Sequence, residues 1–274
     1  MTALPAQAQP IPFGSAQRLV QAGTEPIEVF TYKPAGYKGG PLLLVLHDDA
    51  RDAARYRDHA IPIADAHGYL VAAPRLAGER FAQWRFAWAG IARRTFPDEA
   101  MVLEVEPRER TLDAVLRPLI DTLRRADGAS LPYALLGDGA GGQALLRWAA
   151  FADNEAMHIV IVNPDAILLP TRRLDFPSGF GRLPGTMTGE TRMRDYLALP
   201  ITLLLGRVEP TGALQVSALG QGRNLLSAGQ QAARERNRPL HWRLIEVPGV
   251  GRAAGAMLAS KQALQALVPA FGDE

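Results

Sequence analysis

The sequence predicts an α/β fold, with a mostly parallel central sheet and helices on both of its faces. Short apolar runs alternate along the chain with segments of helical periodicity. Several of these runs are continuously apolar, as in "LLLVL" at Leu42–Leu46, and such runs are typical of strands buried on both faces. Strands that alternate with helices in this way indicate a mostly parallel sheet.

Strands are expected where apolar and β-branched residues gather between turn residues. The stretch "IEVFTY" at Ile27–Tyr32 is rich in β-formers, and the apolar run from Leu42 follows the turn "KPAGYKGGP". The remaining expected strands begin at Tyr69, Tyr133, His158, Ile201 and Trp242. A long excursion that contains glycine and proline, residues 165–200, precedes the strand at Ile201.

Helices are expected where apolar residues recur at intervals of three and four. Residues 53–66 show this spacing, and so do residues 111–126. Further helices are expected after the strand at Tyr133, at about 224–236 and from about 256. Residues 80–97, which are rich in aromatic side chains, are expected to be irregular.

The chain length suits one large domain or two small ones. It has 274 residues, of which 47% are apolar, and it shows no internal repeat and no linker between two cores. We expect a single domain over residues 15–274. Residues 1–14 are expected to be a disordered N-terminus or the remnant of a signal peptide.

The N-terminal residues allow two interpretations. Ala6-Gln7-Ala8 has the small-x-small form of a signal-peptidase site. We therefore expect a secreted or periplasmic protein. An ordinary Ala- and Pro-rich terminus of a cytoplasmic protein is the alternative.

Composition disfavours several classes of partner. The 30 basic and 28 acidic residues are interspersed, so nucleic-acid or membrane-surface binding has little support. No apolar run approaches the roughly 18 residues of a membrane span. The chain has no cysteine, which removes disulfides and thiolate metal sites. We expect no metal and no cofactor, and as partner a small molecule, a polymer or another protein.

One glycine-rich turn carries the strongest functional signal. The strand at Tyr133 runs into Gly137-Asp138-Gly139-Ala140-Gly141, and a helical segment follows. Strand, tight turn and helix form the setting of the nucleophile elbow G-x-S-x-G. Here Gly139 stands where the serine would be.

The same turn also satisfies the dinucleotide fingerprint G-x-G-x-x-G. Gly137, Gly139 and Gly142 supply the three glycines, and Asp165 could serve as the ribose-binding acid. A dinucleotide-binding βαβ unit usually opens its domain, whereas several strands precede this turn. Nucleotide binding is therefore the weaker interpretation.

Residues elsewhere in the chain resemble the α/β-hydrolase superfamily, in particular secreted esterases and polyhydroxybutyrate depolymerases. The stretches that carry the resemblance are "LLLVLHDD" from Leu42, "RYRDHAIPIADAHGYLVAAP" from Arg55, "NPDAILLP" from Asn163, "FPSG" from Phe176 and "VPGVGR" from Val247. They occur in chain order over about residues 41–270. The resemblance implies an α/β-hydrolase fold and an ester or polyester substrate.

Carried over residue by residue, the resemblance implies a degenerate catalytic triad. The nucleophile position falls at Gly139, the acid at Glu209 and the base at Arg252. Glycine has no attacking oxygen. A guanidinium has no acceptor lone pair and stays protonated, so Arg252 cannot act as a general base.

The oxyanion-hole region is expected at His47, Asp48, Asp49 and Ala140. Asp48 replaces the small glycine of the family's His-Gly turn, and Asp138 adds another carboxylate nearby. Negative charge beside a developing oxyanion opposes its stabilisation. Ordinary serine-esterase chemistry is therefore not expected.

Several hypotheses concern what fills the site. Glu209 and Arg252 are proposed to form an ion pair. The carboxylates of Asp48, Asp49 and Asp138 are either solvated turn residues, which we favour, or a site for a cation. Four aromatic residues are either core and loop anchors, which we favour, or an apolar wall for a ligand: Phe81, Trp84, Phe86 and Trp88.

Two other residues could replace the missing serine as the nucleophile. Asp138 would be an aspartyl nucleophile if the register of the turn were shifted by one residue. Ser178 lies in the excursion after the strand at His158, but no histidine is obviously placed to activate it. His47 is expected to pack in a turn, and His59, His67, His158 and His241 are expected to be structural.

The sequence as a whole predicts a hydrolase-fold protein that has lost serine-hydrolase catalysis and binds a ligand or serves as a scaffold. The pocket candidates are Asp138, Trp84, Trp88 and Ser178. An active esterase or polyester hydrolase with an unrecognised nucleophile is the alternative. Nucleotide binding at Gly137–Gly142 is the weaker one.

Overall fold

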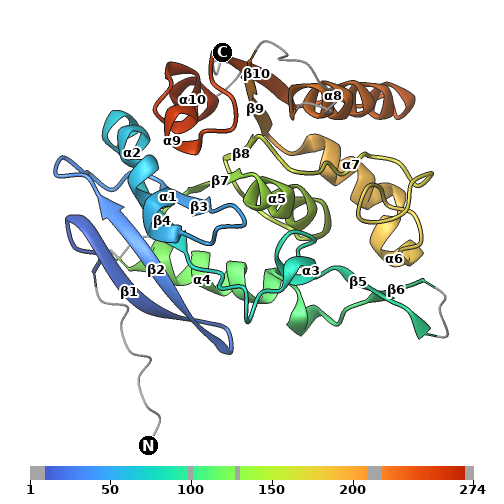
Figure 1. Ribbon diagram of the computed structural model, residues 1–274, viewed down its shortest axis with the longest axis horizontal. Coiled ribbons are helices and arrows are strands. Elements are labelled where there is room, and N and C mark those ends of the chain that lie inside the picture. Colours follow the sequence, from blue (N-terminus) through green and yellow to red (C-terminus); the bar gives the residue numbers. More distant parts are fainter. Residues whose placement is uncertain (1–9, 98–100, 127–129, 209–217, 269–274) are drawn as a thin grey trace, which may run out of the picture.

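A sheet of eight strands forms the centre of the molecule (Figure 1). The computed structural model describes residues 10–97, 101–126, 130–208 and 218–268. The strands of this sheet are β1 (Gly14–Ala22), β2 (Glu25–Lys33), β3 (Leu42–Leu46), β4 (Leu70–Pro74), β7 (Tyr133–Asp138), β8 (His158–Val162), β9 (Ile201–Arg207) and β10 (Arg243–Pro248). Their order is β1-β2-β4-β3-β7-β8-β9-β10.

The sheet is parallel from β4 to β10, and only the pairs β1–β2 and β2–β4 are antiparallel. Every residue of β3, β4, β7 and β8 is buried, because helices cover both faces of these central strands. The predicted α/β class and the mostly parallel sheet are confirmed. The C-terminal ends of the parallel strands share one edge, where ligands of open α/β sheets bind.

Helices cover both faces of the sheet (Figure 1). One hydrophobic cluster joins the sheet to α4 (Asp113–Arg125), α5 (Ala140–Phe151) and α8 (Ala218–Glu235). A second cluster on the opposite face includes α1 (Ala53–His59), α2 (Ile61–His67), α9 (Ala254–Leu258) and α10 (Lys261–Ala266). The remaining short elements are α3 (Gln83–Phe86), η2 (Arg108–Arg110), α6 (Gly185–Thr188) and α7 (Glu190–Ala198).

Three elements differ from the sequence prediction. The helix expected over 53–66 is two helices, because Pro62 lies in the first turn of α2 and has no N–H to continue α1. Residues 80–97, expected to be irregular, contain α3 and the strand β5 (Ala92–Thr95), which pairs with β6 (Val102–Val105). The strand β1 was not predicted.

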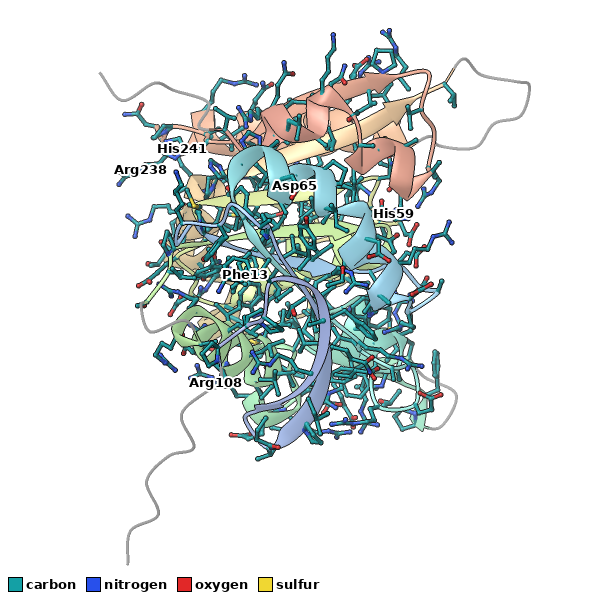
Figure 2. All side chains as sticks on the ribbon, turned by 90° about the vertical axis from the view of Figure 1, so that its left-hand side faces the viewer. Phe13, His59, Asp65, Arg108, Arg238 and His241 are labelled. Atoms are coloured by element: carbon teal, nitrogen blue, oxygen red, sulfur yellow. The ribbon has the colours of Figure 1, made fainter. Side chains whose placement is uncertain are left out.

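The start of the described chain packs against the sheet. Ile11 is buried, and its carbonyl accepts a hydrogen bond from Lys33 Nζ at 3.2 Å. Figure 2 shows Phe13 on the side of the molecule crossed by the curved β1–β2 ribbon. Ala6, Gln7 and Ala8 lie outside the described residues. Within the described ranges, no helix is long and apolar enough to span a membrane.

Candidate functional site at the β7–α5 turn

Gly139 makes the turn between β7 and α5. Its backbone has φ 53° and ψ −116°, a conformation that L-residues rarely adopt. Its N–H donates to the carbonyl of Val162 at 3.0 Å, and its own carbonyl accepts from Gln143 N at 3.0 Å. A nucleophile elbow has the same sharp strand-to-helix turn. Asp138, one residue earlier, is the last residue of β7 and does not occupy the turn.

The neighbouring glycines allow α5 to approach the sheet closely. A Cβ on Gly141 would stand 2.5 Å from the backbone oxygens of Leu46 and His47, and one on Gly137 would stand 2.5 Å from Gly141 O. A Cβ on Gly142 would stand 2.8 Å from Gly137 O. Packing of the turn against its own backbone therefore explains the glycines at these three positions.

Two carboxyl-bearing side chains lie next to Gly139. An ideal Cβ on Gly139 would stand 3.4 Å from Asp165 Oδ2 and 3.4 Å from the Cβ of Asp48. Asp165 N also donates to Gly139 O at 3.4 Å. Burial raises the pKa of Asp165, and the neighbouring Arg252 opposes that rise. A side chain at position 139 would thus be bordered by two acidic residues.

Arg252 forms an ion pair with Asp165. Its Nη2 donates to Asp165 Oδ1 and, at 3.2 Å, to the carbonyl of Asn163. Both side chains are partly exposed, so the pair adds little to the stability of the fold. Glu209, the expected partner of Arg252, lies outside the described residues, and its ion pair stays a prediction.

Asp138 is buried below the turn. The hydroxyl of Tyr56, on α1, donates to Asp138 Oδ2 at 2.6 Å. Burial raises the pKa of Asp138 to about 7, although the Tyr56 hydrogen bond acts in the opposite direction. The side chain is 4% exposed, which makes it a poor candidate for attack on an external substrate.

His47 is held as a structural residue at the end of β3. Its Nε2 accepts from Leu76 N at 3.1 Å, so Nδ1 carries the proton and donates to the carbonyl of Asp48 at 2.8 Å. Burial lowers its pKa to about 4, and the ring is therefore neutral at pH 7. Both ring nitrogens are used within the fold.

The expected oxyanion-hole region lies at this edge of the sheet. Ala140 is the first residue of α5, and the N–H groups of a first helical turn have no intrahelical acceptor. Asp48 Oδ1 accepts from Ala50 N at 3.0 Å in a local turn, and Asp49 is exposed. Among the described residues, no group of three or more His, Asp or Glu side chains is arranged to hold a metal ion.

The aromatic residues of the 80–97 region are divided between core and surface. Phe81 and Phe86 belong to the hydrophobic core. Trp84 and Trp88 are half-buried, with Arg110 over the first ring and Arg94 over the second. Ser178 is exposed, and its backbone carbonyl accepts from Leu169 N.

The other histidines lie apart from one another. His59 and His241 stand on opposite sides of the view in Figure 2. His59 Nε2 lies 3.2 Å from Arg55 Nε on α1, and His67 Nε2 lies 3.1 Å from the carbonyl of Leu264. The first strand residue of β8, His158, is buried.

Two residues that position the site were not singled out from the sequence. Asn163 donates to Gly251 O at 3.1 Å and accepts from Gly206 N at 2.9 Å, so it joins the ends of three strands. Arg147, on α5, is fully buried and donates to the carbonyls of Gln143 and Pro177 at 2.9 and 2.7 Å. Burial lowers the pKa of Arg147 to about 9. The sequence did contain a signal for each residue: Asn163 stands in an Asn-Pro pair directly after a strand, and Arg147 is an arginine inside an apolar helix.

Two solved structures similar to this one carry the names of hydrolases. Poly(aspartic acid) hydrolase-1 from Sphingomonas sp. KT-1 is 24% identical, with a TM-score of 0.79 over 93% of this chain and 99% of that chain. LpqC, a poly(3-hydroxybutyrate) depolymerase from Bordetella parapertussis, is 28% identical, with a TM-score of 0.74 over 93% of this chain and 90% of that chain. No protein-family model and no curated protein matches the sequence.

Proposed function

We propose that this chain, which has the α/β-hydrolase fold and resembles esterases and depolymerases of that superfamily, has lost serine-hydrolase catalysis and binds a ligand or serves as a scaffold. One observation carries the proposal. Gly139 keeps the sharp turn of a nucleophile elbow at φ 53° but supplies no hydroxyl. The turn folds without strain because glycine adopts positive φ freely.

The surroundings of Gly139 support the loss of catalysis. Arg252 stands beside the turn and pairs with Asp165, and a guanidinium cannot accept a proton from a nucleophile. His47 is neutral, but both of its ring nitrogens are engaged in the fold. Asp48, whose Cβ lies 3.4 Å from an ideal Cβ on Gly139, would add negative charge near a developing oxyanion and so oppose its stabilisation.

The ligand is proposed to bind at the C-terminal edge of the sheet, over Gly139, Asp48, Asp165 and Arg252. A small molecule, a polymer segment or a protein partner would satisfy this description. Nucleotide binding is disfavoured here, because the pyrophosphate would meet the carboxylates of Asp48 and Asp165. A titration with NAD, followed by cofactor fluorescence, is expected to show no binding.

The proposal is tested by labelling with a fluorophosphonate probe and by hydrolysis of 4-nitrophenyl butyrate. We expect wild-type protein to take no label and to hydrolyse the ester no faster than a heat-denatured sample. Label on any serine, Ser178 included, would overturn the proposal. Hydrolysis that disappears in a Ser178→Ala variant would overturn it in the same way.

A second candidate is an active hydrolase in which the carboxylate of Asp165 activates a water molecule, and this water takes the place of the serine nucleophile. The observation that favours it is the position of Asp165 Oδ2, 3.4 Å from an ideal Cβ on Gly139. Burial raises the pKa of this carboxyl, which makes it a stronger base toward water. An ester-hydrolysis rate in the wild type that is lost in Asp165→Asn but kept in Ser178→Ala would support this candidate.

A further inference from the structure

A pocket of about 350 Å³ opens at the C-terminal end of α5, away from the β7–α5 turn. Phe151, which lines it, is the last residue of α5 and lies roughly 16 Å along the helix axis from Ala140. The volume falls within the range of about 300–1,000 Å³ that is usual for small-molecule sites. The pocket is therefore separate from the candidate site at Gly139.

The pocket has an apolar floor. Trp148 and Phe151 of α5 line it, together with Ile91 and with Met187 of α6. Ile91 and Trp148 are buried, and Phe151 and Met187 are partly buried against the core. An aromatic ring or a short alkyl chain placed here would bury apolar surface on both partners.

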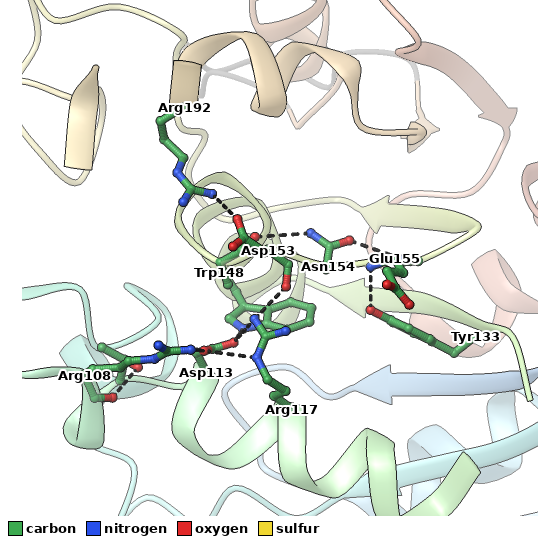
Figure 3. Close-up of polar contacts among 12 residues, drawn as sticks. Arg108, Asp113, Arg117, Tyr133, Trp148, Asp153, Asn154, Glu155 and Arg192 are labelled. Carbon is green, nitrogen blue, oxygen red and sulfur yellow. Dashed lines mark hydrogen bonds and ion pairs between the residues drawn. The ribbon is translucent and has the colours of Figure 1, made fainter. Parts of the chain in front are cut away.

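Three arginines from separate elements line the same pocket (Figure 3). Arg108 comes from η2, Arg117 from α4 and Arg192 from α7. Arg117 is held in place, because it donates to both oxygens of Asp113 and, at 2.6 Å, to the carbonyl of Asp153. Its guanidinium is thus fixed before any ligand arrives.

The carboxylates of the pocket are already engaged. Asp113 accepts hydrogen bonds from Arg108, Arg117 and Trp148 Nε1. Each of its two carboxylate oxygens accepts two of these bonds. Glu106 is 3% exposed and pairs with two arginines that do not line the pocket, Arg93 and Arg110.

The arginines of the pocket keep donor capacity. The side chain of Arg108 is 78% exposed, and its contact to Asp113 is long, at 3.4 Å. Arg192 pairs at 2.9 Å with Asp153, whose side chain is 85% exposed. Exposed pairs of this kind are weak, and a ligand can replace one partner. Each guanidinium carries five N–H donors, so Arg108 and Arg192 have more N–H groups than their contacts to Asp113 and Asp153 use.

We propose that this pocket binds a small organic carboxylate with an aromatic or alkyl body. The carboxylate accepts hydrogen bonds from Arg108 and Arg192, and the apolar body rests on Trp148 and Phe151. The proposal does not depend on the proposed function, because no residue of the two sites is shared.

The test is isothermal titration calorimetry with 4-phenylbutyrate and, in parallel, its neutral analogue 4-phenylbutanamide. We expect the carboxylate to bind with a Kd below about 1 mM and the amide at least tenfold more weakly. Arg108→Gln and Arg192→Gln are each expected to weaken binding of the carboxylate about tenfold, since each removes a charge-assisted donor. Both side chains are at least partly exposed, so the variants are expected to fold.

Arg252→Gln is the matched control, because Arg252 is also a partly exposed arginine paired with a carboxylate. We expect it to leave the Kd of 4-phenylbutyrate unchanged. Equal affinity for the acid and the amide, no heat with the acid up to about 10 mM, or unchanged affinity in both pocket variants would overturn the proposal. Weaker binding in Arg252→Gln alone would overturn it too, because the ligand would then bind near Gly139.

Discussion

The carboxylate of Asp165 lies beside Gly139, with its Oδ2 atom 3.4 Å from the point where a Cβ on that glycine would stand. The other carboxylate oxygen pairs with Arg252. An acidic residue and an arginine thus border the position at which the resemblance to hydrolases implies a serine. The turn has the strand-to-helix geometry of a nucleophile elbow, and glycine and arginine stand at the positions where the resemblance implies serine and histidine.

The glycine at position 141 is expected to be essential for stability. A Cβ there would stand 2.5 Å from the backbone oxygens of Leu46 and His47, which cannot move without displacing β3. Gly141→Ala is expected to lower the free energy of unfolding by about 3 kcal/mol. Urea denaturation measures the change.

Gly78→Ala is the matched control, because Gly78 lies in an exposed turn and a Cβ there would meet nothing within 4 Å. We expect a change smaller than about 1 kcal/mol. Equal effects of the two substitutions would show that α5 does not pack as closely on β3 as described.

Arg147 is expected to hold the chain that follows Asp165. Its guanidinium donates to the carbonyls of Ile167 and Pro177 at 3.3 and 2.7 Å, and to Gln143 on its own helix. Arg147→Met removes the side-chain donor from the partly buried carbonyl of Ile167 and the buried carbonyl of Pro177, and it is expected to cost about 3 kcal/mol of stability. Amide hydrogen exchange is expected to rise over residues 166–180, and unchanged exchange there would contradict the role.

The free energy of unfolding is expected to depend on pH through the ionisation of Asp138. Burial raises its pKa to about 7, from about 3.9 in an unfolded chain. The folded protein therefore keeps a proton that the unfolded chain releases, and Asp138 contributes stability that is full below about pH 4 and is lost as the pH rises to about 7. The loss is expected to be on the order of 2–4 kcal/mol.

Asp138→Asn isolates this effect, because the amide oxygen can still accept from Tyr56 and does not titrate. Burial lowers the pKa of His47 to about 4, so the contribution of His47 to stability rises with pH between about pH 4 and 6.5. This rise occurs in both proteins and cancels in the comparison. The free energy of unfolding of the wild type minus that of the variant is expected to fall from pH 4.5 to 7.5. A flat difference would show that Asp138 ionises normally.

The sequence predicted the central strands well because their signal is strong. β3, β4, β7 and β8 are continuous apolar runs, and the structure buries every residue in them. β1 was missed because it is an edge strand whose side chains are mostly partly exposed or exposed, with Leu19 73% exposed. Its inward-facing residues include Gly14 and Arg18 beside the buried Val20 and Ala22, so its apolar alternation is weak.

The turn at Gly139 could also be predicted, since strand, glycines and helix are adjacent in the sequence. Its surroundings could not. Asp165 and Arg252 are separated by 87 positions, and Tyr56 and Asp138 by 82, so only the fold brings each pair together. Asp165 was considered from the sequence only as a ribose-binding acid, because nothing local indicates that it reaches the β7–α5 turn.

The central claim is that Gly139 occupies a nucleophile position that has lost its serine. The most direct measurement compares wild-type protein with the Gly139→Ser/Arg252→His double variant, by hydrolysis of 4-nitrophenyl butyrate and by fluorophosphonate labelling. We predict a silent, unlabelled wild type and a double variant that takes label at position 139 and turns over the ester. A wild type that is already active and gains nothing from the substitutions, or a folded double variant that takes no label, would contradict the claim.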